Sequence, residues 1–600
     1  MTRTNHEGTV VDAKASVLSY LFYTGKFEVP WHQRYYDWTK EHVSELLYDL
    51  DEAFRENRNC YFLGAVMLVK KANGIWEIND GQQRMVTFSL ICARLARIFR
   101  DEVDTRREAL ALRIFFDLDE NHTRDLSEAD ELTPRLSPPR NDKTNYNLLI
   151  RDKDVSTNGK LTTAWGEIDK HFLAMDPDKA KKFFDFIINK LEVACLFVPK
   201  ELDPSSVFET LNARGKPLGD LDLIRNYFYS FFSGAEEESR RDTVHDSLER
   251  VRAQLREERS QTKALEYMRC YLQCKYGFLP KDRLYREMKG KIKVDCNQFS
   301  PSNSADYVFN LVEDISSKDR VEVFHAISSP SENGSLIEHF LRDSSQSGSL
   351  QNLFIFLCEL KTYTVTQPIV FAFLNRYVQE NNIRKKKGMA RFVHNRLKLL
   401  TSFVMRTTLV ATKFEPSRFE SAFSALAQKI MSAAALDSIP FACVLRDVDD
   451  YGVFDNSNFI EKMEQTTIRH QTKAKRFLLG LAYHQQPDDI AIINERRYTV
   501  EHILPESATH LSGWSNFDQR VHADNIYRIG NLTLLGSADN KPGPAFNGSF
   551  SEKKDIYRNS IISLTQEISE IPDWSIEEIQ KRQKQLAKLA ARVWELPNEQ

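Results

Sequence analysis

The sequence predicts an α+β protein that is predominantly helical, and three observations lead to this prediction. Strand-like segments rich in β-forming residues are concentrated in the first third and the last quarter of the chain. The region between them, from about residue 234 to residue 440, is mainly helical in its pattern and begins with a highly charged stretch. The length of 600 residues exceeds what one hydrophobic core usually organises, so we expect several domains.

The bulk composition is that of an ordinary globular protein. Hydrophobic residues make up 42% and charged residues 28% of the chain, which excludes the disordered and membrane-spanning classes. The N-terminal segment has no signal-peptide pattern, and no window is apolar over the length that a bilayer requires. We therefore expect a cytoplasmic protein without a membrane partner. The formal net charge of −3 is close to balanced, so contact with nucleic acid must come from local patches.

The eight cysteines are scattered along the chain and form no CxxC pair. Cys270 and Cys274 are four residues apart in a helical pattern, and a zinc site is the weaker interpretation because a second ligand pair is missing. We expect small buried thiols in a reduced protein.

The first third of the chain combines strand-like and helical patterns and predicts a compact α+β domain over residues 1–232. Tyr61–Val69 and Gly74–Ile78 are rich in β-forming residues and end at charged or glycine-containing turns. Asp119–Asp142 is dense in charged residues and proline, so we predict an exposed loop there. Apolar residues recur at steps of three and four along one face of a predicted helix, namely Met85, Phe88, Cys92, Leu95 and Phe99.

Residues 233–450 are predicted to form a helical connector, and residues 451–600 a further domain. The last domain begins with a helical pattern and continues with strand-like runs at Tyr498–Ile503 and Ile526–Leu535. A charged helix from Ser575 to Trp594 is expected to close the chain.

A basic run in the connector is the candidate DNA-binding surface. Residues 381–400 contain seven Lys and Arg residues and no Asp or Glu, with Lys385, Lys386 and Lys387 in succession. Such a run is most often a solvated helix face, but in a DNA enzyme it could contact phosphates regardless of base sequence. Both interpretations stay open, and the cations of the closing helix, Arg582 among them, are a second candidate.

A polar motif between a predicted strand and a predicted helix has the features of a phosphate site. It consists of Asp80, Gly81, Gln82, Gln83 and Arg84. A strand-to-helix junction presents free backbone N–H groups and the positive end of the helix dipole, and an arginine adds a forked donor for phosphate oxygens. Gly81 lets the backbone approach closely, and Asp80 could hold a magnesium ion or orient a water molecule.

Two further polar segments support this interpretation. Gln33 and Arg34 lie among aromatic residues upstream, and Asn212 and Arg214 lie in a glycine-containing segment downstream. Each segment alone could be an ordinary turn or a loop before a capped helix. Three arginine-bearing polar motifs in one domain fit a polyphosphate better than they fit a hydrophobic core.

A second constellation, near the C-terminus, points to phosphodiester hydrolysis. Glu501 and His502 end a predicted strand, and Asn531 and Asn540 follow. The reaction needs a base for water and a cation for the charge that develops on the phosphate, so we assign His502 as the base. Glu501 and Asn540 are the predicted oxygen ligands of Mg²⁺ or Mn²⁺. Asn531 completes the catalytic set as the amide that fastens the loop aiming His502.

Two questions about these four residues depend on the three-dimensional structure. Neighbouring side chains of a strand point to opposite faces, so Glu501 and His502 require a twist or a bulge to converge. The alternative interpretation is a buried structural histidine with two asparagines in turns. Four other histidines fall outside the pattern and are expected on the surface: His470, His484, His510 and His522.

Together these motifs resemble the GmrSD-type restriction endonucleases. The DGQQR motif at residues 80–84 resembles the signature of their N-terminal domain, over roughly residues 15–230. EHILP and GNLTLL resemble their C-terminal module, over about residues 450–597. The resemblance implies a ParB/sulfiredoxin-like fold for the first domain and a ββα-metal (HNH, His-Me finger) nuclease fold for the last. His32 departs from the family, which more often has an aromatic residue at that position.

The resemblance also implies an activity. The N-terminal domain would bind and hydrolyse a nucleoside triphosphate (GTP, ATP or another), with Asp80, Gln82, Gln83 and Arg84 at the site. The whole chain would be a modification-dependent (type IV) restriction endonuclease, similar to the BrxU and SspE groups. Such an enzyme cuts modified double-stranded phage DNA in prokaryotic defence, and a homodimer is implied.

Two other functions fit the same residues. The chain could be a nucleotide-gated DNA-binding or signalling protein with an inactive nuclease site, although the intact set of Glu501, His502, Asn531 and Asn540 argues against it. It could also be a nuclease toxin that acts on RNA or on the DNA of its own host. Magnesium-dependent nicking of a plasmid separates an active nuclease from an inactive one.

Overall fold

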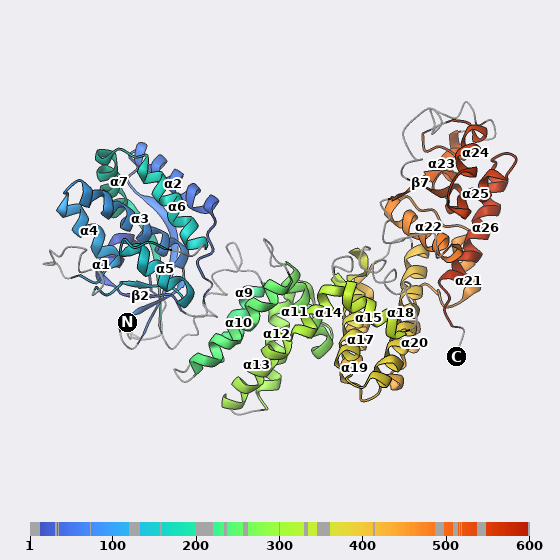
Figure 1. Cartoon of the computed structure of the whole chain (residues 1–600), viewed down its shortest axis with the longest axis horizontal. Helices are drawn as coiled ribbons and strands as arrows, with labels where there is room; N and C mark the ends of the chain where they lie inside the picture. The colour runs from blue at the N-terminus through green and yellow to red at the C-terminus, as the bar shows by residue number, and fades with distance from the viewer. Residues whose placement is uncertain are drawn as a thin grey trace, which may run out of the picture. The chain divides into compact units, whose positions relative to one another are not determined.

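The computed structural model divides the chain into two compact units, Met1–Ser233 and Gly234–Gln600 (Figure 1). The residues that it describes are 12–30, 33, 35–71, 74–118, 132–155, 159–199, 220–232, 237–255, 262–298, 301–328, 334–344, 361–411, 415–486, 497–507, 514, 517, 519–536 and 548–597. Most of them are helical, with a mixed sheet in the first unit and a two-stranded sheet in the second, so the predominantly helical α+β class is confirmed. The predicted boundary near residue 450 stays a prediction.

The sheet of the first unit has six strands in the order β1-β6-β3-β4-β2-β5. The strands are β1 (Asp12–Val17), β2 (Phe27–Glu28), β3 (Tyr61–Lys70), β4 (Trp76–Asp80), β5 (Leu136–Ser137) and β6 (Leu191–Val198). β3 pairs parallel with β6 and antiparallel with β4, so the sheet is mixed. The two predicted strands are confirmed in β3 and β4, where Val66, Leu68 and Ile78 are fully buried.

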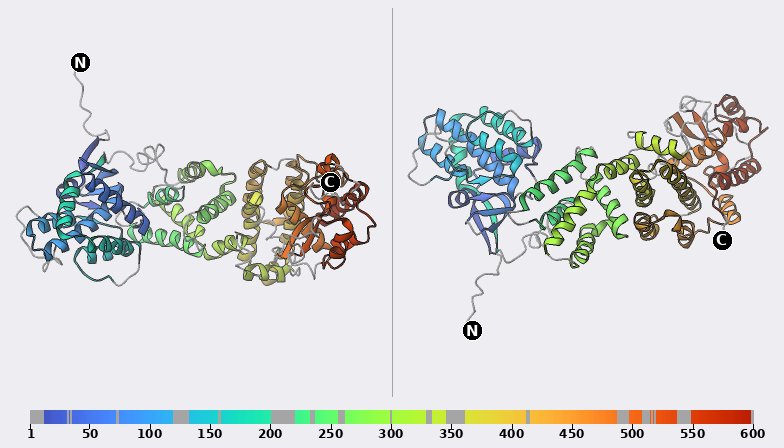
Figure 2. Two further views of the ribbon diagram at one scale, coloured as in Figure 1. Left: turned by 90° about the horizontal axis from the view of Figure 1, so that it is seen from above. Right: turned by 60° about the horizontal axis from the view of Figure 1, so that its bottom comes forward.

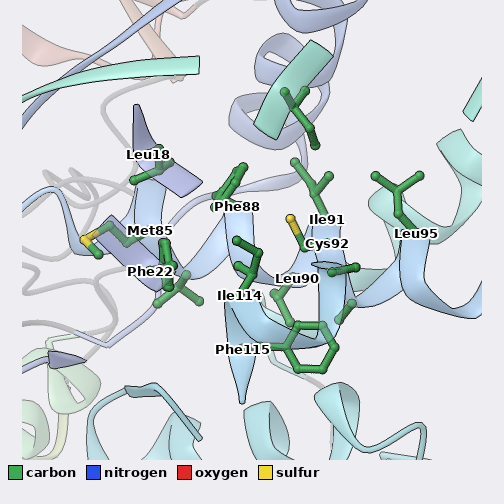
Figure 3. Packing of buried hydrophobic residues seen from close by; sticks show 14 of the residues in the cluster. Leu18, Phe22, Met85, Phe88, Leu90, Ile91, Cys92, Leu95, Ile114 and Phe115 are labelled. Atoms are coloured by element: carbon green, nitrogen blue, oxygen red, sulfur yellow. The ribbon is translucent and has the colours of Figure 1, made fainter. Parts of the chain in front are cut away.

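Helix α3 is the buried centre of the first unit. The helices of this unit are α1 (Leu18–Thr24), α2 (Lys40–Arg55), α3 (Gln82–Asp101), α4 (Thr105–Phe115), α5 (Arg140–Ile150), α6 (Lys160–Leu173), α7 (Pro177–Lys190) and α9 (Asp220–Tyr229). All five predicted face residues of α3 are buried, and Figure 3 shows Met85 beside Phe22 and Leu90 beside Phe115. α3 packs against α4, α6 and α7, so it is surrounded by other helices of the unit.

The loop predicted at residues 119–142 is wrong at its C-terminal end. Leu136 belongs to β5, which pairs parallel with β2, and α5 begins at Arg140. Leu136 is fully buried, and the guanidinium of the buried Arg135 donates to three backbone carbonyl oxygens. These partners are distant in the sequence, so local composition could not reveal the strand. Residues 119–131 lie outside the described residues.

The second unit begins with the predicted helical region (Figures 1 and 2). Its helices are α10 (Glu238–Gln254), α11 (Thr262–Tyr276), α12 (Leu284–Cys296), α13 (Pro301–Ile315), α14 (Lys318–Ser328), α15 (Gly334–Ser344), α17 (Gln367–Gln379), α18 (Ile383–Val410), α19 (Ser417–Ser432) and α20 (Phe441–Asp447), with the 3-10 turns η3 (Lys281–Arg283), η4 (Lys361–Thr366) and η5 (Leu436–Ser438). α17 contacts α11, α14, α18 and α19 and is buried along most of its length. The helical connector is therefore a packed bundle.

The last part of the second unit surrounds a two-stranded sheet with helices. The elements are α21 (Asn456–Met463), α22 (Gln471–Gln485), β7 (Tyr498–His502), α23 (Gln519–Asn525), η8 (Ile529–Asn531), β8 (Leu532–Gly536), α24 (Phe550–Arg558), α25 (Ser563–Ser569) and α26 (Ile576–Val593). β7 and β8 pair antiparallel without a register shift. The second predicted strand starts later than expected, because residues 526–531 form a turn and a 3-10 helix. The predicted closing helix is confirmed in α26.

Helix α18 connects the basic run to the last part of the chain. It has 28 residues, and the basic run forms its beginning. Near its end, the fully buried Arg406 donates to the backbone oxygens of Val453, Ala591 and Trp594. Burial lowers the pKa of this guanidinium to about 10, so it remains charged at neutral pH. Arg406 therefore fixes the end of α18 to the end of α26.

Two expectations from composition can be compared with the structure. Cys60 and Cys443 are exposed, so the expectation of buried thiols is wrong for these two, whereas the other described cysteines are buried. The Cys274 thiol donates to the backbone oxygen of Pro368. None of the helices in the described ranges has the length and apolar character that a membrane crossing requires.

Candidate functional site

The DGQQR motif forms the junction between β4 and α3, as predicted. Gly81 is the N-cap of α3 and has φ of 87°, a left-handed conformation that favours glycine. A Cβ at Gly81 would lie 2.9 Å from a Val66 methyl carbon and 3.1 Å from the backbone oxygen of Ala65, so β3 also requires glycine here. The carboxylate of Asp80 accepts from the Gly81 N–H at 2.7 Å, and it lies 3.8 Å from the Arg84 guanidinium.

The glutamines of this motif hold the upstream segment in place. Gln83 is buried, and its side chain accepts from the Asp37 N–H and donates to the Tyr35 oxygen. Gln33 donates from its amide to the Asn79 oxygen at 3.0 Å. Gln82 is buried as well. Asp80 and Arg84 are thus the more exposed polar groups of the junction, and Arg34, Asn212 and Arg214 lie outside the described residues.

Gly64 is a residue of this site that the sequence reasoning missed. It lies at a register shift in β3 with φ of 119°, and a Cβ there would lie 1.9 Å from a terminal nitrogen of Arg84. The Arg84 guanidinium crosses the bare backbone at this point and donates to the Leu63 oxygen at 3.3 Å. A glycine inside a strand pattern often marks such a close approach, which is the signal that was available.

Glu501 and His502 do not converge in the structure. The carboxylate of Glu501 is buried and accepts from the Lys553 ammonium at 2.7 Å and from the Tyr557 hydroxyl at 3.1 Å. The register of β7 with β8 is unbroken, so the bulge that convergence required is absent from these described strands. Burial raises the pKa of Glu501, and the nearby Lys553 opposes this shift. Both contacts are made to Oε1, and a metal ion bound to this carboxylate would lie close to the Lys553 ammonium.

Lys553 of α24 is a second residue that the sequence reasoning missed. Besides Glu501, its ammonium binds the backbone oxygens of His502 at 2.9 Å and Ile503 at 3.1 Å. Its position could have been noticed, because it lies between Phe550 and Tyr557 on the buried face of α24, where a charged residue needs a partner. Lys553 therefore holds two consecutive backbone carbonyl groups, those of His502 and Ile503.

His502 is the last residue of β7 and is partly buried. Its ring makes an edge contact with the Tyr527 ring, with centroids 5.7 Å apart. Burial lowers the pKa of His502, the carboxylate of Glu506 opposes this, and the Lys553 ammonium adds to the lowering. The imidazole is therefore neutral at neutral pH, which is the form that can accept a proton from water. Tyr527 also donates from its hydroxyl to Glu506 at 2.8 Å.

Asn531, the last residue of η8, is fully buried. Its side-chain oxygen accepts from the Leu504 N–H at 2.8 Å and from the indole of Trp574 at 3.1 Å. Its amide nitrogen donates to the oxygens of Leu504 and Ile526. These contacts support the role of an amide that fastens the turn after His502, and its part in catalysis stays a prediction.

Two expectations about neighbouring residues are wrong. His522 is buried rather than on the surface, and its ring nitrogen hydrogen-bonds the Pro505 oxygen at 2.7 Å. Arg582 is buried too, and it donates to the oxygens of Gly530 and Leu532, so it is not available to DNA. His470 and His484 are exposed as expected, and His510 lies outside the described residues.

The described residues do not form a metal site by themselves. Within the described ranges, no group of three or more His, Cys, Asp or Glu side chains could hold an ion. The Glu501 carboxylate is already neutralised by Lys553, whereas the exposed carboxylate of Glu506 lies on the same side as His502. Asn540 lies outside the described residues.

The basic run is on the surface of α18. Lys385 and Lys387 are exposed, and the Lys386 ammonium lies 4.8 Å from the centre of the Tyr377 ring. A DNA-binding role for these lysines stays a prediction.

Two family models match the chain over both candidate sites. The model described as GmrSD restriction endonuclease, N-terminal domain, matches residues 18–229, which include the DGQQR motif. The model described as GmrSD restriction endonucleases, C-terminal domain, matches residues 453–589, which include His502 and Lys553. A search of curated proteins gives no match.

Proposed function

The chain belongs to the GmrSD restriction endonuclease family and is thus a DNA endonuclease of the restriction type, and we propose that it cuts modified foreign DNA in a nucleotide-dependent reaction. The observation that carries the nuclease assignment is the position of His502 inside the matched C-terminal domain, where Lys553 binds its backbone oxygen and Asn531 binds the backbone of Leu504. An imidazole with a lowered pKa and a fixed backbone is suited to act as a general base near neutral pH.

In the proposed reaction, His502 takes a proton from a water molecule whose oxygen attacks the phosphorus. The bond between phosphorus and the leaving oxygen breaks, and that oxygen is protonated from solvent. We propose that Mg²⁺ or Mn²⁺ supplies charge stabilisation at the phosphate. Among the described residues, the exposed carboxylate of Glu506, close to His502, fits such a cation, and Asn540 remains the second ligand predicted from the sequence. A cation on Glu501 would lie close to the Lys553 ammonium.

The pH dependence of cleavage tests the protonation state of His502. Because the pKa of His502 is lowered from its ordinary value of 6.5, the basic form persists below that pH. We expect the rate of cleavage to be constant through neutral pH and to fall with decreasing pH only below 6.5. Single-turnover rates at several pH values measure this directly. An acid limb centred above 7 would show that a different group is the base.

The N-terminal unit is proposed to bind and hydrolyse a nucleoside triphosphate such as GTP or ATP. Arg84 would contact phosphate oxygens at the N-terminus of α3, and Asp80 would orient a water or a cation-bound phosphate. Gln33 and Gln83 would act by fixing the segment above the junction.

Gly64→Ala tests the placement of Arg84 without changing the arginine itself. The added methyl group would occupy the position of the Arg84 guanidinium, so we expect triphosphate hydrolysis to fall by about 10²-fold, as for the loss of one charge-stabilising donor. Gly74→Ala is the matched control, because Gly74 also has a positive φ but open space around its Cβ. Equal hydrolysis by both variants would show that the position of Arg84 is unimportant.

Substrate comparison tests the whole proposal. Unmodified, hydroxymethylated, glucosylated and phosphorothioated duplexes are incubated with the protein and Mg²⁺, with and without GTP or ATP. We expect cleavage of at least one modified duplex, stimulated by a nucleotide, and no cleavage of the unmodified one. Equal cleavage of all four duplexes, independent of nucleotide, would contradict modification dependence.

We also propose that the protein is a homodimer. Sedimentation of the full chain measures its oligomeric state.

A further inference from the structure

A pocket of about 790 Å³ opens in the second unit between the end of α18, helix α21 and the first turn of α22. Its surface is polar and apolar in nearly equal parts, and the polar residues that line it include Tyr451, Lys462, Thr466, Arg469, His470 and Lys473. Nothing in the proposed roles of His502, Asn531 or the basic run accounts for it.

The pocket is positively charged. Lys462, Arg469 and Lys473 line it against one carboxylate, Glu461. In the part of the chain that the structure describes, none of these three cations forms an ion pair, and the Lys462 ammonium donates to the backbone oxygen of Tyr451. Burial lowers the pKa of Lys473, which indicates an ammonium that is partly removed from water without a compensating anion. Such a site is stabilised by a bound anion.

Two consecutive contacts connect the pocket to His502. The Arg469 guanidinium lies 5.4 Å from the centre of the Tyr527 ring, and this ring in turn makes the edge contact with His502. The segments are also joined through the backbone, since the Ile468 N–H donates to the Tyr527 oxygen at 2.8 Å. Arg469 is therefore within about three base steps of His502, because a DNA strand advances about 3.4 Å per step along its axis.

We propose that this pocket binds the phosphodiester backbone of the DNA strand beside the phosphate that is attacked by the water molecule that His502 deprotonates. Arg469 and Lys473 would pair with successive phosphates, and Lys462 would add a third positive charge. The ligand is a backbone rather than a base, because the lining offers cations and hydroxyls but few aromatic surfaces. This inference rests on the proposed role of His502, since that role places the scissile phosphate nearby.

The test is the salt dependence of DNA binding by the full-length double variant Arg469→Gln/Lys473→Gln. Fluorescence anisotropy with a labelled duplex, in EDTA to prevent cleavage, gives the Kd at several salt concentrations. We expect at least a tenfold higher Kd, and a slope of log Kd against log salt that is smaller by about two, one per lost phosphate contact. Arg469→Lys/Lys473→Arg should restore binding, because it keeps both charges.

Lys429→Gln is the matched control, since Lys429 is an exposed cation of the same unit that does not line the pocket. We expect it to bind DNA like the wild type. An unchanged slope in the double variant, with an unchanged melting temperature, would overturn the inference. A double variant that binds DNA normally but loses affinity for free GTP or ATP would overturn it too, because the pocket would then hold a nucleotide.

The same variants separate this inference from the proposed function. If His502→Ala still cuts DNA, the role of His502 fails, whatever the pocket binds. If His502→Ala is inactive while the double variant binds and cuts like the wild type, the pocket inference alone fails. Inactivity of both, with DNA affinity lost only in the double variant, supports both.

Discussion

Replacement of His502 by alanine is expected to lower the rate of DNA cleavage by about 10²- to 10⁴-fold, the usual contribution of a general base. The loss should appear in the chemical step, since the neutral imidazole is the proposed acceptor for the proton of water. Single-turnover cleavage of a modified duplex at saturating protein measures it. DNA affinity should be unchanged, because the proposed phosphate contacts of Arg469 and Lys473 remain.

The control for this variant is His484→Ala, which removes an exposed histidine of α22 in the same unit. It should cut DNA like the wild type. Hydrolysis of GTP or ATP should persist in both variants, since the DGQQR motif belongs to the other unit. Undiminished cleavage by His502→Ala, in protein free of contaminating nuclease, would refute the assignment of the base.

Lys553→Met is expected to destabilise the second unit by about 3–5 kcal/mol, the usual cost of leaving one partner of a buried ion pair uncompensated. It leaves the Glu501 carboxylate buried with the Tyr557 hydroxyl, and it removes the contact with the His502 oxygen. Chemical denaturation measures the loss of stability. Cleavage should fall as well, even under conditions in which the variant is folded, because the backbone at His502 is less firmly held.

The pH dependence of the stability of Lys553→Met tests whether the buried Glu501 carboxylate causes the loss of stability. Burial raises the pKa of Glu501, and removal of the ammonium should raise it further. Protonation of Glu501 removes the buried charge. The loss of unfolding free energy in Lys553→Met should therefore be largest above this raised pKa and should decrease as the pH falls through it. Glu501→Gln/Lys553→Met should recover part of the stability at neutral pH. A deficit that does not change with pH would mean that Glu501 carries no buried charge.

Glu501→Gln alone separates the two roles considered for Glu501. If the carboxylate anchors α24, this variant should lose stability in the absence of any metal, because the Lys553 ammonium loses its counter-ion. If it is a metal ligand, the loss should appear mainly in the response of cleavage to Mg²⁺.

The junction between β4 and α3 in the first unit was predicted correctly because its signals are local. Gly81 needs a left-handed conformation where a strand meets a helix, and the apolar spacing after it determines α3. The sequence around Gly64 does not indicate which residue contacts it, because the Arg84 side chain comes from another element. The strand at Leu136 escaped prediction for the same reason: its partner, β2, is far away in the sequence.

In the last part of the second unit, too, the contacts of single residues with distant segments could not be predicted from the sequence. The alternation of side chains along a strand placed Glu501 and His502 on opposite faces, but only the packing of α24 shows what Glu501 contacts. His522 was wrongly predicted to lie on the surface, because a single histidine gives no periodic pattern from which its burial could be predicted. The Pro505 oxygen that it contacts belongs to another segment. The contact from Arg469 through Tyr527 to His502 also joins three separate segments.

Helix α18 sets a fixed distance between the exposed lysines and the cationic pocket. At 1.5 Å per residue, its 28 residues span about 42 Å, or about twelve base steps of DNA. One end carries the exposed lysines, and the other lines the cationic pocket and is fixed by Arg406. A duplex contacted at both ends would therefore be cut at a constant offset from the place where the lysines hold it, whatever its base sequence.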